Sequence, residues 1–439
     1  MLLMLIAKDV VLGNSLDDGG IPVRRNPIVR LTGIQNNKKG CISFSDDDLS
    51  KHILNIGGTG AGKTNVIVEM TKQIKSQLTS RDVMIVFDTK NDFVELHGEN
   101  DSVITNAMEE RLKSGIAWNI FMELVTDGWD KEAIEINADE IANLIFAESI
   151  EKSQSPFFPK AAKDLFAAIL KGITFIGIEN KEHRVKYMNN DALKKYLSKV
   201  NAKMLCDFLK NFPELSGVLK YIGDGSSEQA LGVLAELEET TGKIFRKAFG
   251  LDGRFSVRKF VKEKGGRTLF IEYDLSCGST FIPMYKILFD MFLKQSLCNT
   301  NGGMVYVICD ELKLLPHLLH LEDGINFGRS VGVKIVAGIQ SMEQLYEVYG
   351  EIGGKNIASG FQTTICFHTN NQATRDYIKG IHGSNYSAIQ HMGASNNLQE
   401  NVRDGFTVED WDMANLGLGE AIVGLPFEKP IKFKFERYR

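Results

Sequence analysis

The sequence predicts an α/β protein with a central, mostly parallel sheet and an inserted all-α domain. Residues 53–56 form a short apolar strand, 64–77 carry helical apolar spacing, and 83–87 form a second apolar strand, which together make a βαβ unit. The second strand is apolar throughout and the first has Asn55 as its single polar residue, as is typical of a parallel sheet covered on both faces. Residues 130–262 are mostly helical, and strand patterns return only after them.

The order of these patterns divides the chain into three expected parts. Residues 1–50 carry short extended runs separated by Gly, Asn and Asp turns, which predicts a small β-rich part. Residues 51–129 and 263–439 are expected to form one main domain around a single sheet. Residues 130–262 are expected to form the all-α insertion domain, with helices at 138–147, 161–173, 191–200, 202–211 and 229–247.

Composition narrows the class of protein. The chain has 439 residues, of which 43% are hydrophobic and 24% are charged, as is usual for soluble globular proteins. The formal net charge of −5 excludes a surface that is basic all over, so nucleic acid would need a local patch such as the lining of a ring. No stretch reaches about 18 apolar residues. We therefore expect a cytoplasmic chain without a transmembrane segment.

A glycine-rich loop follows the first strand of the βαβ unit and opens its helix. Small residues let backbone N–H groups surround a phosphate at a helix N-terminus. Lys63 would reach the β- and γ-phosphates of ATP, and the Thr64 hydroxyl would bind Mg²⁺. A chance match is the alternative, but the flanking strand and helix make it rare. The loop consists of Gly57, Gly58, Thr59, Gly60, Ala61, Gly62, Lys63 and Thr64.

A second element, residues 304–311, is a buried strand that ends in two carboxylates. This is the Walker B pattern, in which Asp310 would hold Mg²⁺ and Glu311 would polarise the attacking water. The alternative is an ordinary acidic turn at a strand end. Together with the glycine loop, the pattern favours hydrolysis of ATP.

A third strand, residues 333–339, is followed by Gln340, 29 positions after Glu311. On an adjacent parallel strand this amide would lie beside the γ-phosphate and orient water or sense the phosphate; the alternative is a strand-end cap. Arg329 comes just before this strand. We expect it on the rim of the sheet near the nucleotide, as an arginine finger for a neighbouring subunit; the alternative is a surface salt bridge.

Two further groups carry weaker signals. His317 and His320 lie on an apolar stretch, where packing is favoured over metal binding because no acidic third ligand is evident. Residues 432–439 alternate basic and apolar residues like an edge strand. Their basic side chains could contact DNA phosphates, although a solvated strand face is the simpler interpretation.

With these residues placed, the chain resembles the type IV coupling proteins of conjugation and secretion (the TraD/TraG-like family), which belong to the FtsK–HerA division of P-loop motors. The resemblance begins near residue 41 and covers nearly all that follows. Asn91 stands where the family usually has glycine, and Ile120 where it usually has proline. The segments that carry the resemblance are LSKHIL (49–54), FDTKNDF (87–93), AWNIF (117–121), FFPKAA (157–162) and the stretch 328–350.

The resemblance implies a RecA-like motor domain with an all-α insertion, assembled as a homo-hexamer or monomeric when isolated. It implies ATP and Mg²⁺ as cofactors, Arg329 as the finger and Gln340 as the sensor. It also implies DNA, single- or double-stranded, a relaxase or effector cargo, and membrane-bound secretion components as partners. The chain would act at the inner face of the cell membrane through such a partner. Alternatives are a secretion ATPase for protein effectors, a HerA-like DNA-processing motor working with a nuclease, and a nucleotide-gated scaffold.

Overall fold

The computed structural model describes residues 5–105, 116–273, 278–298, 302–392 and 398–438. Among these residues, the centre of the molecule is an 11-stranded sheet with the order β3-β2-β14-β13-β10-β4-β9-β8-β5-β7-β6. The strands from β10 to β6 run parallel, whereas β13, β14, β2 and β3 join them antiparallel. The predicted fold class is confirmed: a mixed α/β fold with a large, mostly parallel sheet and a helical insert.

The strands of this sheet are β2 (Val29–Gln35), β3 (Lys38–Phe44), β4 (Ile53–Ile56), β5 (Val83–Asp88), β6 (Ser102–Thr105), β7 (Arg267–Glu272), β8 (Val305–Cys309), β9 (Val333–Ile339), β10 (Thr363–Phe367), β13 (Glu420–Gly424) and β14 (Ile431–Phe435). The helices around it are α1 (Asp46–Leu49), α2 (Lys63–Lys75), α10 (Val257–Glu263), α11 (Gly278–Leu297), α12 (Leu321–Asn326), α13 (Met342–Ser359), α14 (Gln372–His382) and α15 (Asp410–Ala414).

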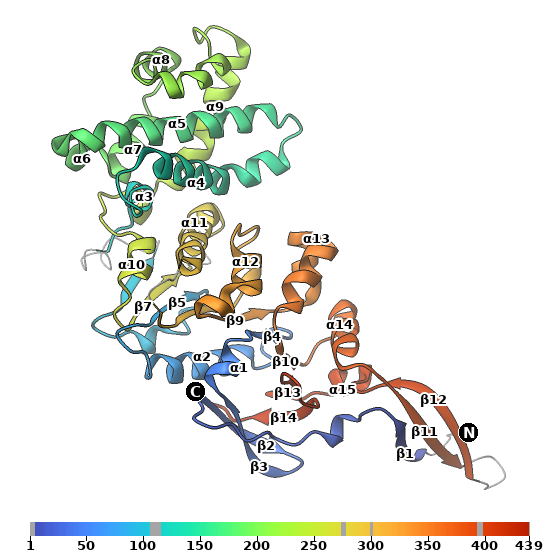
Figure 1. The fold of residues 1–439 in the computed structure, drawn as a ribbon. Helices are drawn as coiled ribbons and strands as arrows, with labels where there is room; N and C mark the ends of the chain where they lie inside the picture. The colour runs from blue at the N-terminus through green and yellow to red at the C-terminus, as the bar shows by residue number, and fades with distance from the viewer. Residues whose placement is uncertain (1–4, 106–115, 274–277, 299–301, 393–397, 439) are drawn as a thin grey trace.

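Helices cover both faces of the central strands, which explains why these strands are mostly apolar in the sequence. Every residue of β4, β5, β8, β9 and β10 is buried. On one face, Val66, Ile67 and Met70 of α2 pack against the sheet. On the other face lie α11, α12 and α13, with Leu288 and Phe289 of α11 in the core (Figure 1).

The helices α3 to α9, called the insert from here on, form an all-α lobe above this second face (Figure 1). This lobe includes α3, which precedes the predicted range of 130–262, and leaves out α10, which begins within that range. Helices lie at all five predicted places, and the long α4, α5 and α9 pack together. Most of them begin at a side chain that accepts a backbone N–H, which fixes the helix start: Asn119, Asp130, Asn180, Asn189, Asn201 and Ser227. The helices are α3 (Ile120–Leu124), α4 (Lys131–Lys152), α5 (Phe157–Glu179), α6 (Lys181–Tyr187), α7 (Asn190–Leu197), α8 (Ala202–Leu209) and α9 (Glu228–Ile244).

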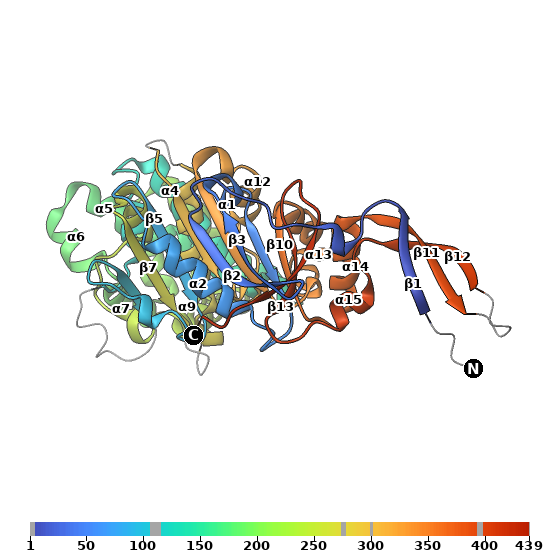
Figure 2. The ribbon, with the colours of Figure 1, turned by 90° about the horizontal axis from the view of Figure 1, so that it is seen from below.

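The predicted boundaries of the three parts stay a prediction. Strands from residues 1–50 join two different sheets. β2 and β3 extend the main sheet through β14. β1 (Leu5–Leu12) pairs with β11 (Ser384–Met392), which pairs with β12 (Leu398–Phe406), and this small sheet projects away from the main one (Figures 1 and 2).

The interpretation of residues 432–439 as an edge strand is wrong. β14 lies between β13 and β2 and pairs with both. Its apolar residues are buried because they face the core under α2, while Lys432 and Lys434 are exposed. The alternation comes from a sheet with one covered face rather than from an edge.

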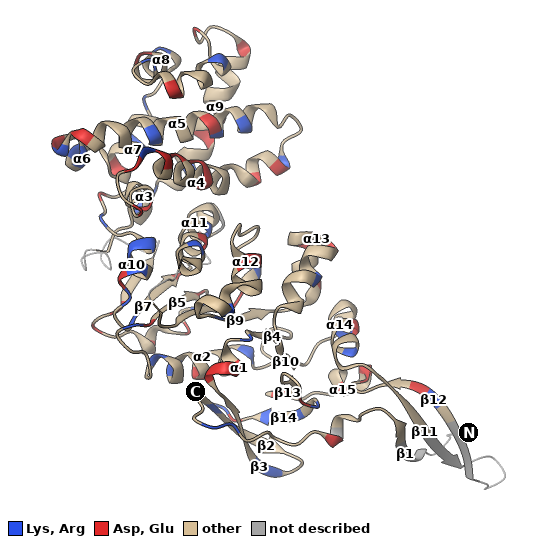
Figure 3. Ribbon diagram, in the orientation of Figure 1, with Lys and Arg blue, Asp and Glu red and all other residues tan. Residues whose placement is uncertain are grey.

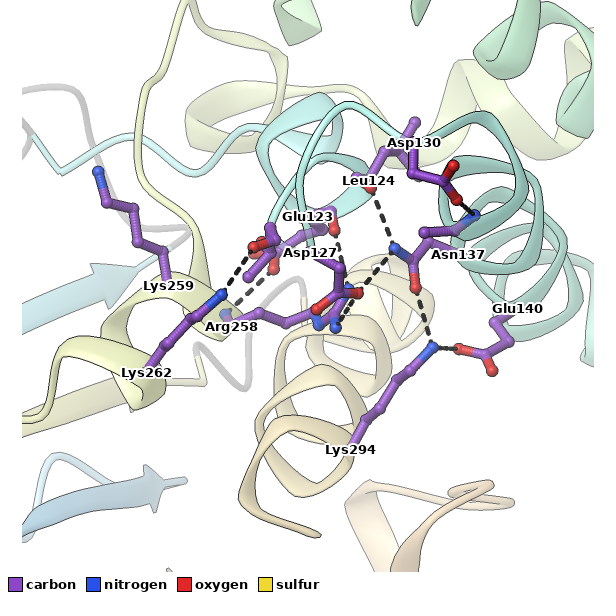
Figure 4. A network of polar contacts seen from close by, with 12 residues as sticks. Glu123, Leu124, Asp127, Asp130, Asn137, Glu140, Arg258, Lys259, Lys262 and Lys294 are labelled. Atoms are coloured by element: carbon purple, nitrogen blue, oxygen red, sulfur yellow. Dashed lines mark hydrogen bonds and ion pairs between the residues drawn. The ribbon is translucent and has the colours of Figure 1, made fainter. Parts of the chain in front are cut away.

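A buried polar network joins the insert to the main domain (Figure 4). The carboxylate of Glu123 on α3 caps the start of α10: it accepts from the backbone N–H groups of Val257 (2.6 Å) and Arg258 (3.1 Å), and from the Ser256 hydroxyl (2.9 Å). The Trp118 indole donates to the same carboxylate (2.8 Å). The Arg258 guanidinium donates in turn to the Glu123 carbonyl and to the Asp127 carboxylate.

The same network continues from α4 of the insert to α11. Asn137 donates to the Leu124 carbonyl (3.0 Å) and to Asp127 (3.3 Å), and its oxygen accepts from Lys294 (2.9 Å). Lys294 also pairs with Glu140 (Figure 4). The insert is therefore fixed to α10 and α11 by charged and amide groups in addition to apolar contacts.

Charges of both signs are mixed along the helices of the insert and around the sheet (Figure 3), in agreement with the small net charge. Within the described ranges, no helix is both long enough and apolar enough to span a lipid bilayer.

Candidate nucleotide site

The glycine loop connects the carboxyl end of β4 to the start of α2, as predicted from the sequence. Two positions require glycine. Gly62 has a φ of 122°, which strains residues with a side chain. At Gly57, an added Cβ would lie 2.7 Å from the Cβ of Phe367 on β10. The loop thus owes its shape to glycine at its first turn and at the cap of α2.

Lys63 is buried at the start of α2, with 8% of its surface exposed. Its ammonium donates to the carbonyls of Gly57 (2.5 Å) and Gly58 (3.2 Å), so the loop itself holds the cation over its own turn. Burial lowers the pKa of Lys63, and the nearby carboxylates of Glu311 and Asp310 oppose that shift. A phosphate bound in the loop would be the natural partner of this cation.

Asp310 lies at the carboxyl end of β8, and its Oδ2 accepts a hydrogen bond from the Thr64 hydroxyl (2.9 Å). Burial raises the pKa of Asp310 to about 6, although the Thr64 bond and the Lys63 charge act in the opposite direction. Its other oxygen is buried and has no hydrogen-bond partner in the described part of the chain. A hydroxyl beside a carboxylate with a free oxygen fits a hard divalent cation such as Mg²⁺, which prefers oxygen ligands.

Glu311 and Gln340 meet across neighbouring strands, because β8 and β9 pair in parallel and both residues follow the strand ends. The Gln340 amide donates to Glu311 Oε2 at 3.0 Å, and its backbone N–H donates to Gln344 Oε1 at 2.9 Å. Glu311 Oε1 is buried, and the described residues provide no hydrogen bond to it. One carboxylate oxygen is therefore held by an amide while the other remains available.

Arg329 does not lie near the nucleotide edge, and that expectation is wrong. It precedes β9 and forms an exposed ion pair with Asp47 of α1 at 3.1 Å. Since α1 precedes β4 and the glycine loop follows it, Arg329 lies at the amino ends of the strands, across the sheet from the glycine loop. It cannot reach the site of its own chain; a site on another subunit is the arrangement that its position leaves open.

A cavity of about 700 Å³ brings the predicted residues together. One side is lined by Asp310, Glu311, Gln340 and part of the glycine loop, namely Thr59, Gly60, Gly62, Lys63 and Thr64; Gly57, Gly58 and Ala61 do not line it. The other lining residues are ones that the sequence patterns did not identify as site residues: Ile34, Asn65, Lys90, Asp92, Leu418, Gly419, Lys434, Phe435, Glu436 and Arg437.

Lys90 and Asp92 belong to the FDTKNDF segment, which the resemblance pointed to without a role. The buried Asp88 at the end of β5 accepts backbone N–H bonds from Lys90 (3.1 Å), Asp92 (3.0 Å) and Phe93 (3.0 Å). Asn91 has a φ of 58°, which explains why glycine or asparagine suits this position. This folded turn presents Lys90 and Asp92 to the cavity.

The two histidines lie away from the cavity, at the interface of α4, α11 and the loop before α12. His320 Nδ1 contacts Asp290 Oδ2 at 2.7 Å, and His317 Nε2 lies 3.4 Å from Glu151. Burial lowers the pKa of His320, but the hydrogen bond and the charge of the Asp290 carboxylate outweigh this effect, so the pKa is raised.

Comparison with known proteins places this geometry in a family. Residues 37–415 match the family described as the type IV secretion-system coupling protein DNA-binding domain. Coupling protein TraD of Escherichia coli strain K12 is 23% identical over 430 residues, which cover 93% of this chain and 52% of TraD. The chain thus spans about half the length of this curated relative.

Solved structures of the plasmid coupling protein TrwB share the fold. The unbound form superimposes with a TM-score of 0.73 and 16% identity, covering 99% of this chain and 94% of that chain. A form in complex with ADP and Mg²⁺ gives 0.71 and 16%, covering 100% and 96%. Because the family match extends over most of the chain, including the glycine loop, Asp310 and Gln340, the chain belongs to the family of the type IV secretion-system coupling protein DNA-binding domain.

Proposed function

We propose that the chain hydrolyses ATP and uses the energy to move DNA, or DNA with bound protein, toward a type IV secretion or conjugation channel. The observation that carries the proposal is the position of two strand-end carboxylates at the nucleotide cavity. Asp310 accepts a hydrogen bond from Thr64 of the glycine loop, and Glu311 accepts one from Gln340 at the end of the neighbouring strand. The family match supports DNA as the substrate that is moved, and the ADP and Mg²⁺ complex of TrwB supports the choice of nucleotide.

In the proposed reaction, each side chain has a separate task. Lys63 exchanges its carbonyl partners for the β- and γ-phosphates of ATP. Thr64 and Asp310 would hold Mg²⁺, which when bound supplies positive charge to the phosphate oxygens. Glu311 accepts a proton from the attacking water through its free oxygen. Gln340 orients Glu311 and, once the γ-phosphate is present, the water.

The reaction is tested by ATP turnover with single- and double-stranded DNA at low salt. We expect DNA to stimulate turnover, and Lys63→Ala to abolish turnover on either strand form because the main phosphate contact is lost. Stimulation should weaken steeply as salt rises, since contacts to phosphates release counterions. An assembled ring whose turnover ignores both DNA forms would contradict DNA transport and favour a protein cargo.

We infer that the working form is a homo-hexamer in which Arg329 acts on the neighbouring subunit. Its exposed position across the sheet from its own glycine loop supports this role. A finger can contribute about 10³-fold or more to turnover. Lys63→Ala and Arg329→Ala chains should each be nearly inactive, and mixing them should restore part of the activity if not every site must be intact.

The mixing experiment measures turnover against mixing ratio, after mixed oligomers have been verified. Lys355→Ala is a suitable control, because Lys355 forms an exposed ion pair with Glu351 on α13. Near-normal turnover of homogeneous Arg329→Ala would contradict the finger, and the Asp47 pair would then be a surface salt bridge.

The insert has a different proposed task. The residues that line the cavity include none from α3 to α9. We therefore propose that the insert selects the cargo, such as a relaxase or an effector protein, and that membrane-bound secretion components hold the motor at the inner face of the membrane.

A further inference from the structure

The cavity has a second wall, formed by a segment far from the glycine loop in sequence. Residues 435–438, here named the closing segment, begin at the last residue of β14 and pass beside the first turn of α2. Phe435, Glu436 and Arg437 line the cavity together with Leu418 and Ile34. Two of these apolar side chains are exposed, Leu418 to 75% and Ile34 to 43%. Exposed apolar groups inside a cavity leave a surface that a flat, partly apolar ligand can cover.

Asn65, the residue after Thr64, holds the closing segment in place. Its amide nitrogen donates to the Glu436 carbonyl at 2.9 Å, and its amide oxygen accepts from the Tyr438 N–H at 2.9 Å. One side chain thereby satisfies a backbone acceptor and a backbone donor of the same strand-like segment. The phosphate loop and the second wall are linked through adjacent residues, Thr64 and Asn65.

The other end of the closing segment is also tied to the glycine loop. The Gly419 N–H donates to the Ala61 carbonyl at 3.1 Å, and the Gly419 carbonyl accepts from the Phe435 N–H at 2.9 Å. The Glu436 N–H donates to the Thr32 carbonyl at 3.1 Å. The wall therefore keeps a fixed distance from the loop that would bind the phosphates.

We propose that the closing segment and Leu418 form the nucleoside end of the site, and that Asn65 is the positioning residue of this wall. The proposal rests on the nucleotide site proposed above. In the proposed site the phosphates of ATP are bound by the glycine loop, including Lys63 and Thr64. The sugar and base of the same ATP molecule must then occupy the rest of the cavity. Leu418 and Ile34 offer apolar surface to the base, and Arg437 offers a planar cation that stacks well on aromatic rings.

This wall offers little to distinguish one purine from another. Its polar side chains, Lys434, Glu436 and Arg437, are all exposed, and Glu436 already accepts from the Thr32 hydroxyl at 2.6 Å. Strong discrimination requires buried partners that are left unpaired by the wrong base, whereas apolar contacts discriminate by only about a hundredfold. We expect ATP and GTP to differ in affinity by less than this factor.

The test compares ATP with inorganic tripolyphosphate, which has the phosphates but no nucleoside. Both affinities are measured by calorimetry in the presence of Mg²⁺, with wild type and Asn65→Ala. The loss of two hydrogen bonds should weaken ATP binding by about tenfold or more. Tripolyphosphate binding should stay within about twofold, because the loop is unchanged. A role limited to folding would lower both affinities together.

A matched control lies on the same helix. Gln73 makes the same kind of contact to Arg30 of β2, accepting from its N–H at 2.8 Å and donating to its carbonyl at 2.9 Å. It lies about 12 Å along α2 from Asn65. Gln73→Ala should leave both affinities unchanged. Leu418→Ala is a second variant whose exposed site does not threaten folding, and it should weaken ATP but not tripolyphosphate.

Different results separate this proposal from the proposed function. If wild type binds neither ligand, the nucleotide site itself is wrong. If wild type binds both equally well, or if Asn65→Ala and Leu418→Ala leave the ratio of ATP to tripolyphosphate affinity unchanged, the nucleoside wall is wrong while the phosphate site stands. A preference between ATP and GTP of about 10⁴-fold would also contradict the proposed nucleoside wall, because that ratio requires a buried polar group that hydrogen-bonds to only one of the two bases.

Discussion

The nucleotide site and the polar network around Glu123, Arg258 and Lys294, here called the joint, both contain buried carboxylate oxygens. They differ in how many of these oxygens accept hydrogen bonds. Glu123 is fully buried, and each of its two oxygens accepts two hydrogen bonds. Asp310 is 4% exposed and, among the described residues, accepts at one oxygen only. Glu311 is partly exposed, but its Oε1 is buried and the described residues provide no hydrogen bond to it. A buried carboxylate with all its lone pairs occupied fixes the fold, whereas one with a free oxygen is prepared for a ligand.

The difference extends to the neighbouring cations. At the joint, Arg258 and Lys294 each pair with a carboxylate, Asp127 and Glu140. At the site, the described part of the chain gives Lys63 two carbonyl hydrogen bonds but no ion pair, and burial lowers its pKa although Glu311 and Asp310 oppose the shift. Uncompensated buried charge costs stability, and proteins retain it where a ligand completes it.

The largest expected effect tests the free oxygen of Glu311. Glu311→Gln keeps the shape but removes the proton acceptor, so turnover should fall by about 10³-fold while ATP binding persists. Glu343→Gln, an exposed change at the start of α13, is the control. Steady-state turnover and binding of a nucleotide analogue are the two measurements. Wild-type turnover in Glu311→Gln would mean that the open carboxylate has no catalytic role.

A substitution in the joint should lower the stability of the fold rather than the rate of ATP turnover. Glu123→Ala leaves four donors without their acceptor, two of them backbone N–H groups of α10. We expect a loss of about 3 kcal/mol in the free energy of unfolding, measured by urea titration. Glu132→Ala, an exposed change on α4, should lose almost nothing. A change below about 0.5 kcal/mol for Glu123→Ala would contradict a structural role for the joint.

Local patterns were enough to predict which residues meet on the glycine-loop side of the cavity. The glycine loop, Asp310, Glu311 and Gln340 each follow an apolar strand, and parallel strands bring their carboxyl ends to one edge. The same rule places Arg329 correctly, because a residue before a strand lies at its amino end.

The second wall could not be found in this way. Asn65 contacts Glu436 and Tyr438, which lie 371 and 373 positions away in the sequence. No periodicity or motif links them, because the contact depends on β14 pairing beside β2. The alternation of residues 432–435 was visible, but an edge strand and a strand with one covered face give the same pattern.

A third buried group, His52, has hydrogen-bond partners that suit only its neutral form. His52 lies before β4 with 1% of its surface exposed. Its Nε2 contacts the Ile325 carbonyl at 3.0 Å, and its Nδ1 lies 3.1 Å from the Ile335 N–H, which donates to it. The neutral ring with hydrogen on Nε2 satisfies both contacts. A protonated ring would place a second hydrogen against the Ile335 N–H.

Acid should therefore destabilise the fold through His52, by the smallest of the three effects. Burial lowers the pKa of His52 to about 4 from its ordinary value of 6.5. Between these values the unfolded chain binds a proton that the folded chain does not, so stability falls as pH falls. From pH 7 to pH 5 the loss is about 2 kcal/mol. His52→Asn suits the φ of 59° and should flatten this part of the pH dependence, whatever its stability at pH 7. His382, whose pKa burial also lowers to about 4, is present in both proteins and cancels in the difference. Equal pH slopes for wild type and His52→Asn, measured by urea titration, would show that the site accepts the charged ring.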